Sequence, residues 1–344
     1  MRIVRLPAPG VRADYGAVIR RHVLASLFAS FAIRPARAQA PAFLPALVYA
    51  VGQKFDRSFN ESAFAGAERF RGSSGIAPLE FEPRAPAQFE QAVAAFARRG
   101  ATDIAAVGFY YAAPLAQLAP RFPAIRFTLI DGVVEAANVR SVVWREHEGA
   151  FLAGVLAALA SRSGTVGFVA ALDIPLIRRF TAGFAAGAEH AHPGIGVLVN
   201  FVGTTPEAFN DPARAAEVAG AQFDCGADVV FAGAGVSNLG VFQRAVERGR
   251  LAIGVDANQN GLHPGTILTS LIKHVDVAVE GAFAEARAGN WRAGLRTFGL
   301  AEGGLSLAFD EHNAPLVTAA MRAAVERARA EIVAGRIAVP DGTR

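Results

Sequence analysis

The loop at residues 52–60 gathers side chains suited to holding a small organic molecule. It contains an acid, an aromatic ring and an amide at close spacing: Asp56, Phe59 and Asn60. A phenyl ring can stack on a planar ligand, while a carboxylate and an amide can hydrogen-bond its polar edge. Asp56 and Asn60 also have a plainer interpretation, because short polar side chains before a helix often cap its first N–H groups.

Other candidate ligand-binding residues are spread along the chain. They are Asp131 and Asp256, each at the end of an apolar run, together with Phe180 and Lys273. Phe180 is a second candidate stacking ring, and Phe55 and Phe209 are weaker ones. The chain has 32 Arg but only two Lys, so a Lys can mark a place that needs a compact charge. For the other lysine, Lys54, we expect a solvated position at the rim.

Several catalytic and cofactor motifs do not occur in the sequence. Residues 146–148 read Glu-His-Glu but lack the H-E-x-x-H spacing, and the only cysteine is Cys225. The glycines at 233–235 are followed by neither the G-x-G-x-x-G spacing nor a Walker lysine, and no G-x-S-x-G elbow is present. We therefore expect no enzymatic activity, no metal and no cofactor.

Strand and helix patterns alternate along the chain in two series. An apolar run at 46–51 precedes the loop and a helical pattern at 61–70 follows it, and the alternation continues to 144. A second series runs from 164 to 256. Short apolar runs bounded by glycine and polar residues are typical of strands buried on both faces. The sequence therefore predicts an α/β fold with two parallel-sheet lobes.

The last ninety residues predict that the chain returns to the first lobe. They contain strand patterns at 266–272 and 305–309 and helical patterns at 276–288 and 315–334. We expect a first lobe of residues 41–144 plus 275–298 and a second lobe of 145–274 plus 299–340, joined by a multi-strand hinge. Ligand sites of such sheets lie at the carboxyl ends of the strands, where the candidate residues occur.

Residues 1–40 resemble a signal peptide. Arg20 and Arg21 precede a short apolar segment and an Ala-rich end, which permits the Sec or the twin-arginine route. We expect a soluble periplasmic protein, and no lipid anchor, because no Cys stands at the cleavage point. This segment carries a formal charge of +6 and the whole chain +4, so the rest carries −2. That balance does not favour nucleic-acid binding.

Five motifs, in order, resemble those of the BMP family, the purine nucleoside receptor type of substrate-binding protein. They are Asp56-x-Ser58-Phe59-Asn60, Glu148–Gly154, the run from Asp173 to Phe184, Ile253–Asp256 and Leu268–Asp276. The similarity covers roughly residues 41–344. Two features of this chain depart from the family pattern. Gln53-Lys54-Phe55 stands where members often have a Gly-rich loop. Many members are lipoproteins, whereas we expect no lipid anchor here.

The resemblance implies a type I periplasmic-binding fold, a purine nucleoside or related purine as ligand, and delivery to a membrane ABC permease. We expect Asp256 to accept hydrogen bonds from ribose hydroxyls, with a turn or capping role as the alternative, and we expect a ribose hydroxyl or Asp256 as the partner of Lys273. The resemblance implies no catalysis, and we expect a monomer. Two alternatives stay open: a binding protein for a sugar or amide-like solute, and an exported nucleoside-cleaving enzyme.

Overall fold

The computed structural model of the protein describes residues 42–85 and 87–342. The predicted signal peptide at 1–40 lies outside the described residues. Within the described ranges, no helix is both long and apolar enough to cross a bilayer.

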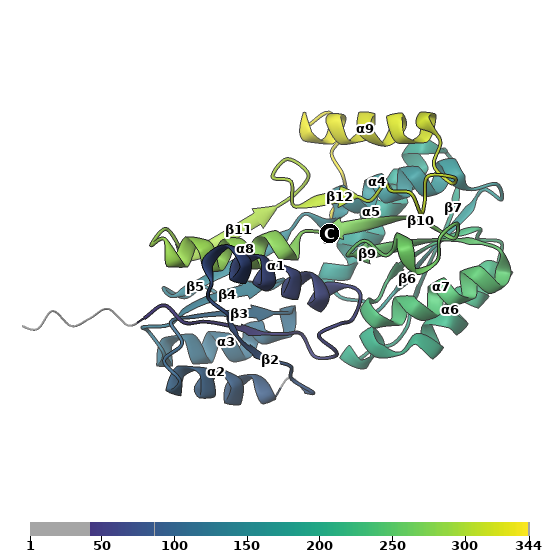
Figure 1. Ribbon diagram of the computed structural model, residues 1–344. Helices are drawn as coiled ribbons and strands as arrows, with labels where there is room; N and C mark the ends of the chain where they lie inside the picture. The colour runs from purple at the N-terminus through teal and green to yellow at the C-terminus, as the bar shows by residue number, and fades with distance from the viewer. Residues whose placement is uncertain (1–41, 86, 343–344) are drawn as a thin grey trace, which may run out of the picture. The chain divides into compact units, whose positions relative to one another are not determined.

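The first sheet combines strands from the beginning and the end of the chain (Figure 1). Its order is β11-β5-β4-β3-β1-β2, and all neighbours are parallel. The strands are β1 (Pro45–Val48), β2 (Leu79–Phe81), β3 (Asp103–Val107), β4 (Arg126–Ile130), β5 (Val139–Trp144) and β11 (Gly294–Phe298). Helices α1 (Phe59–Ser74) and α8 (Val275–Arg287) cover one face, and α2 (Gln88–Arg98) and α3 (Ala112–Leu118) the other.

The second sheet follows the order β12-β10-β9-β8-β6-β7, in which only β12 is antiparallel. Its strands are β6 (Thr165–Ala170), β7 (Gly196–Phe201), β8 (Val229–Gly233), β9 (Leu251–Asp256), β10 (Ile267–Lys273) and β12 (Leu305–Leu307). Its helices are α4 (Glu146–Ala160), α5 (Pro175–Ala191), α6 (Pro212–Asp224), α7 (Asn238–Arg248) and α9 (Ala319–Val333). The chain passes between the sheets after β5, after β10 and after β11, as a multi-strand hinge requires.

Glycines allow α4 and α5 to pack with their backbones in contact. A Cβ at Gly183 would lie 2.2 Å from the carbonyl oxygen of His147, and one at Gly187 would lie 1.9 Å from that of Phe151. On α4, a Cβ at Gly154 would meet the carbonyl oxygen of Phe184 at 2.1 Å. Real Cβ atoms do not approach this closely, so only glycine fits. This packing fixes the start of α5, which carries Phe180.

Two strands were not predicted from the sequence, and one helix begins later than predicted. The strands that were not predicted are the short strands β2 and β11. β2 has only three residues, and β11 lies at a half-exposed edge of the sheet, so neither strand shows a clear apolar pattern. The helix predicted over 315–334 begins only at Ala319. Thr318 caps it, since its hydroxyl accepts the N–H of Met321 at 3.2 Å.

Candidate functional site

The carboxyl ends of strands from both sheets face one pocket. Its empty space, including space open to solvent, is about 910 Å³. All seven residues predicted from sequence line it: Asp56, Phe59, Asn60, Asp131, Phe180, Asp256 and Lys273. Parallel strands place their carboxyl ends at the same edge of a sheet, which explains how residues 217 positions apart come together.

The carboxylate of Asp56 caps helix α1 from the loop. It accepts the backbone N–H groups of Ser58 at 2.8 Å, Asn60 at 2.9 Å and Glu61 at 3.1 Å. Burial raises the pKa of Asp56, and these three donors oppose the rise. The capping interpretation is therefore seen in the structure, while contact between Asp56 and a ligand stays a prediction.

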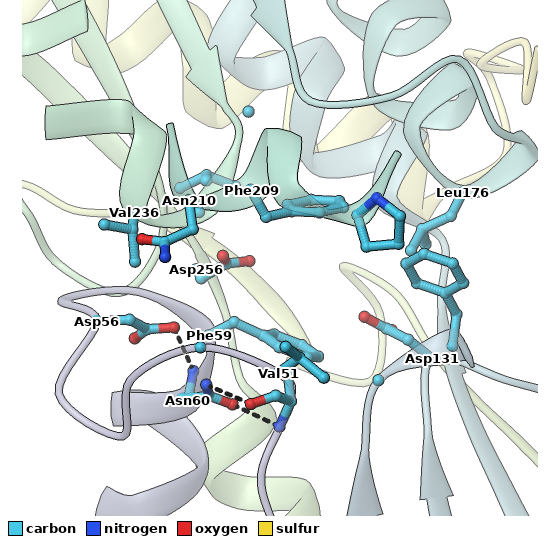
Figure 2. Close-up of a pocket in the computed structure, with 18 of the residues that line it drawn as sticks. Val51, Asp56, Phe59, Asn60, Asp131, Leu176, Phe209, Asn210, Val236 and Asp256 are labelled. Atoms are coloured by element: carbon cyan, nitrogen blue, oxygen red, sulfur yellow. Dashed lines mark hydrogen bonds between the residues drawn. The ribbon is translucent and has the colours of Figure 1, made fainter. Parts of the chain in front are cut away.

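The side chain of Asn60 folds back on its own loop. Its amide donates to the carbonyl oxygens of Ala50 at 3.1 Å and Gln53 at 3.0 Å, and its oxygen accepts the N–H of Ala50 at 2.9 Å (Figure 2). Both amide hydrogens are thus used within the loop. Asn60 holds the end of β1 against the start of α1, and its predicted contact with a base stays a prediction.

Lys273 is almost fully buried between two carboxylates. Its ammonium lies 2.6 Å from Oδ1 of Asp131 and 3.0 Å from Oε1 of Glu146. Burial alone would lower the pKa of Lys273, but the neighbouring carboxylates raise it, so the ammonium stays charged. Asp256 was the carboxylate expected as its partner. The structure shows Asp131 and Glu146 in that place, with Asp256 acting on Lys273 through its charge alone.

Asp256, the last residue of β9, and Asp131, the residue after β4, adopt a left-handed backbone conformation, with φ of 68° and 67°. Such a conformation is uncommon outside glycine and often marks functional positions. Oδ2 of Asp256 accepts the hydroxyl of Ser58 at 2.6 Å. Burial raises the pKa of Asp256 to about 6, against the opposing effects of Lys273 and Ser58.

Two phenyl rings face each other across the pocket. Figure 2 shows Phe59 on one side and Phe209, in the short helix Pro206–Asn210, on the other. Phe180, the second ring favoured from sequence, lines the pocket but is 6% exposed and packs against Phe231 in the core. Phe55 is 60% exposed, packs edge-on against Phe64 and does not line the pocket. Phe209 is thus better placed than sequence reasoning indicated.

Three residues near the pocket differ from their sequence-based interpretation. Glu146 was considered only for a metal, yet it is buried beside Lys273. Tyr110 lines the pocket and was missed, although its place after β3 is a carboxyl-end position. The side chain of Lys54 is 15% exposed, pairs with Glu80 and lies 3.8 Å from the ring centre of Phe64, so it is not the solvated rim residue expected. Within the described ranges, no cluster of three or more acidic, His or Cys side chains is arranged to hold a metal.

Residues 44–343 match the family described as ABC transporter substrate-binding protein PnrA-like (Bmp). The chain is 32% identical over 272 residues to an uncharacterized lipoprotein of Pyrococcus abyssi, covering 76% of this chain and 67% of that protein. It is 28% identical over 308 residues to the ABC transporter nucleoside-binding protein BmpA of Lactococcus lactis, covering 83% and 85%. The name of the Pyrococcus protein conflicts with our expectation of a protein without a lipid anchor.

A solved structure supports the same conclusion. The solute-binding protein of an ABC transporter system from Aeropyrum pernix superposes with a TM-score of 0.78 at 28% identity, covering 87% of this chain and 94% of that one. The type I periplasmic-binding fold is thereby confirmed, as is the predicted family. The chain belongs to the PnrA-like family of ABC transporter substrate-binding proteins.

Proposed function

We propose that this protein binds a purine nucleoside, or a related purine, in the pocket between its two sheets. The observation that carries the proposal is the pair of facing rings, Phe59 and Phe209, beside a polar group of acids and one ammonium. A purine fits between two phenyl rings, and stacking of a base on an aromatic side chain contributes about 1–3 kcal/mol. The relative named a nucleoside-binding protein supports the same ligand class.

The polar side of the pocket suits a ribose. Among the described residues, none hydrogen-bonds to Oδ1 of Asp256 or Oδ2 of Asp131, and the ammonium of Lys273 has a third hydrogen beyond its two carboxylate bonds. A diol can donate to the carboxylates and accept from the ammonium. The charged side chains that line the pocket are three aspartates and one lysine, so a neutral ligand is favoured over an anionic one.

We further propose how the parts of the chain act together. The lobes 41–144 plus 275–298 and 145–274 plus 299–340 close on the ligand, and the closed form docks on an ABC permease. The protein acts as a monomer, without a cofactor, without catalysis and without nucleic acid. Residues 1–40 direct its export to the periplasm. The mass of the mature N-terminus, measured on soluble and membrane fractions, tests export and distinguishes a free from a lipidated chain.

Calorimetric titration with adenosine, guanosine, inosine and the free bases tests the ligand. Binding of at least one of them is expected, and heat from none would refute the assignment. Phe59→Ala should weaken nucleoside binding about tenfold or more, because one stacking ring is lost. Phe55→Ala is the matched control, since that ring is exposed outside the pocket.

The wild type and the Phe59→Ala variant also distinguish the proposed function from its two alternatives. A sugar or amide-like solute needs no stacking, so Phe59→Ala would weaken its binding far less. A nucleoside-cleaving enzyme would need a general acid and an activated water. Incubation with inosine should release no hypoxanthine if the protein only binds, and its release would favour the enzyme.

A further inference from the structure

Tyr110 and Tyr111 are adjacent in the short helix Phe109–Tyr111, yet their hydroxyls lie in different surroundings. Tyr111 is fully buried, and its hydroxyl donates to the carbonyl oxygen of Tyr49 at 2.8 Å. Tyr110 is half-buried and lines the ligand pocket. The two side chains therefore have the same chemistry, but only one of them can reach a ligand.

The hydroxyl of Tyr110 is used as an acceptor and keeps its proton free. It accepts the backbone N–H of Val51. A phenol is both a donor and an acceptor, and within the described part of the chain no group accepts the Tyr110 proton. Burial raises the pKa of Tyr110, the N–H of Val51 opposes the rise, and the charge of Asp56 adds a smaller increase, so the hydroxyl stays protonated at neutral pH.

The position of this ring is built into the fold. Gly108 precedes it with φ of 125°, and a Cβ there would lie 3.0 Å from Cζ and 3.2 Å from the hydroxyl oxygen of Tyr110. The ring also packs edge-on against Phe109 at 5.1 Å and Tyr111 at 4.8 Å between centroids. The hydroxyl is thus held at the pocket wall in advance of binding.

We infer that Tyr110 is a specificity-determining residue, which donates a hydrogen bond to an acceptor on the base of the bound ligand. A ring nitrogen or a carbonyl oxygen of a purine is an acceptor of this kind. This inference rests on the proposed function. A ligand with no acceptor at that point leaves the Tyr110 proton unpaired in a partly buried site, which weakens binding.

Two phenylalanine substitutions isolate this hydroxyl. Tyr110→Phe keeps the ring but removes both the donor and the acceptor of the Val51 N–H, and Tyr111→Phe removes the hydroxyl of a tyrosine outside the pocket. Titration of both variants and the wild type with nucleosides should show binding about 10- to 100-fold weaker for Tyr110→Phe. Tyr111→Phe should stay within about twofold of the wild type, because the hydroxyl of Tyr111 donates to Tyr49 and Tyr111 is not among the described residues that line the pocket. Denaturant unfolding of each variant separates loss of affinity from loss of folded protein.

Deazapurine nucleosides then identify a ring-nitrogen acceptor, since each replaces one ring nitrogen by a carbon. A comparison of guanosine and inosine with adenosine tests the carbonyl oxygen of the base as the acceptor. One of these changes should weaken binding to the wild type but leave binding to Tyr110→Phe unchanged. If folded Tyr110→Phe and the wild type bind nucleosides with equal affinity, this inference alone is overturned. A wild type that binds no nucleoside or purine would overturn the proposed function as well.

Discussion

The ammonium of Lys273 lies 2.6 Å from the carboxylate of Asp131, which joins the end of β10 in the second sheet to the end of β4 in the first. Glu146, at the start of α4, accepts a second bond from the same ammonium at 3.0 Å. Lys273 therefore pairs with two carboxylates that lie 142 and 127 positions away in the sequence. Asp131 and Lys273 of this cluster also line the pocket.

Lys273→Met should destabilise the protein by about 3–5 kcal/mol, because it removes the ammonium that pairs with two buried carboxylates and leaves Glu146 with the more distant Arg179, at 3.6 Å. The free energy of unfolding, measured in urea, checks this. Arg214→Ala is the control, since it breaks only the exposed pair with Glu217 and should change stability little. A loss below about 1 kcal/mol for Lys273→Met would show that the cluster does not stabilise the fold as its geometry indicates.

Asp256 should make the stability of the ligand-free protein fall as pH rises from about 4 to 7. Its pKa in the folded protein is about 6, above the ordinary value of 3.8, so in this window the folded state holds a proton that the unfolded state has lost. The contribution is full below pH 3.8 and declines through pH 6, by up to about 3 kcal/mol. Asp256→Asn should remove it, so the stability difference between wild type and variant should shrink or reverse across the window. A difference that does not vary with pH would contradict the prediction.

Nucleoside binding should weaken as pH falls through about 6. A ribose hydroxyl that donates to Asp256 requires its ionised form, and the pKa of this group in the free protein is about 6. Each unit of pH below that value should therefore weaken binding by up to about tenfold. Titrations at pH 5, 6, 7 and 8 measure the effect. Asp256→Asn should bind weakly at every pH; the same slope in this variant would assign the titration to another group.

Gly187→Ala should disrupt the packing of α4 and α5. The added Cβ would lie 1.9 Å from the carbonyl oxygen of Phe151, so the helices must separate, and a loss of about 1–3 kcal/mol or more is expected. Gly281→Ala is a matched control inside α8, where a Cβ meets nothing within 4 Å. That variant should gain about 0.5–1 kcal/mol, because alanine favours helix over glycine. Thermal unfolding of both variants measures the contrast, and equal effects of the two substitutions would argue against the close contact.

The sequence by itself determined the two mostly parallel sheets and seven of the residues that line the pocket. Apolar runs bounded by glycine and polar residues marked the buried strands, and polar residues such as Asp131 and Asp256 at their ends marked the site. This inference works because carboxyl ends of parallel strands converge whatever the exact packing. The short strand β2 and the edge strand β11 were not predicted, since their sequences show little apolar pattern.

Only the tertiary structure decided which of these residues bond to one another. Asp131 and Glu146 lie 142 and 127 positions from Lys273, and no local spacing shows that they, rather than Asp256, hold its ammonium. The amide of Asn60 is used by its own loop, and Phe209 rather than Phe180 faces Phe59. Hydrogen bonds and ring contacts depend on distances of a few ångströms between segments, which packing sets and the order of residues does not.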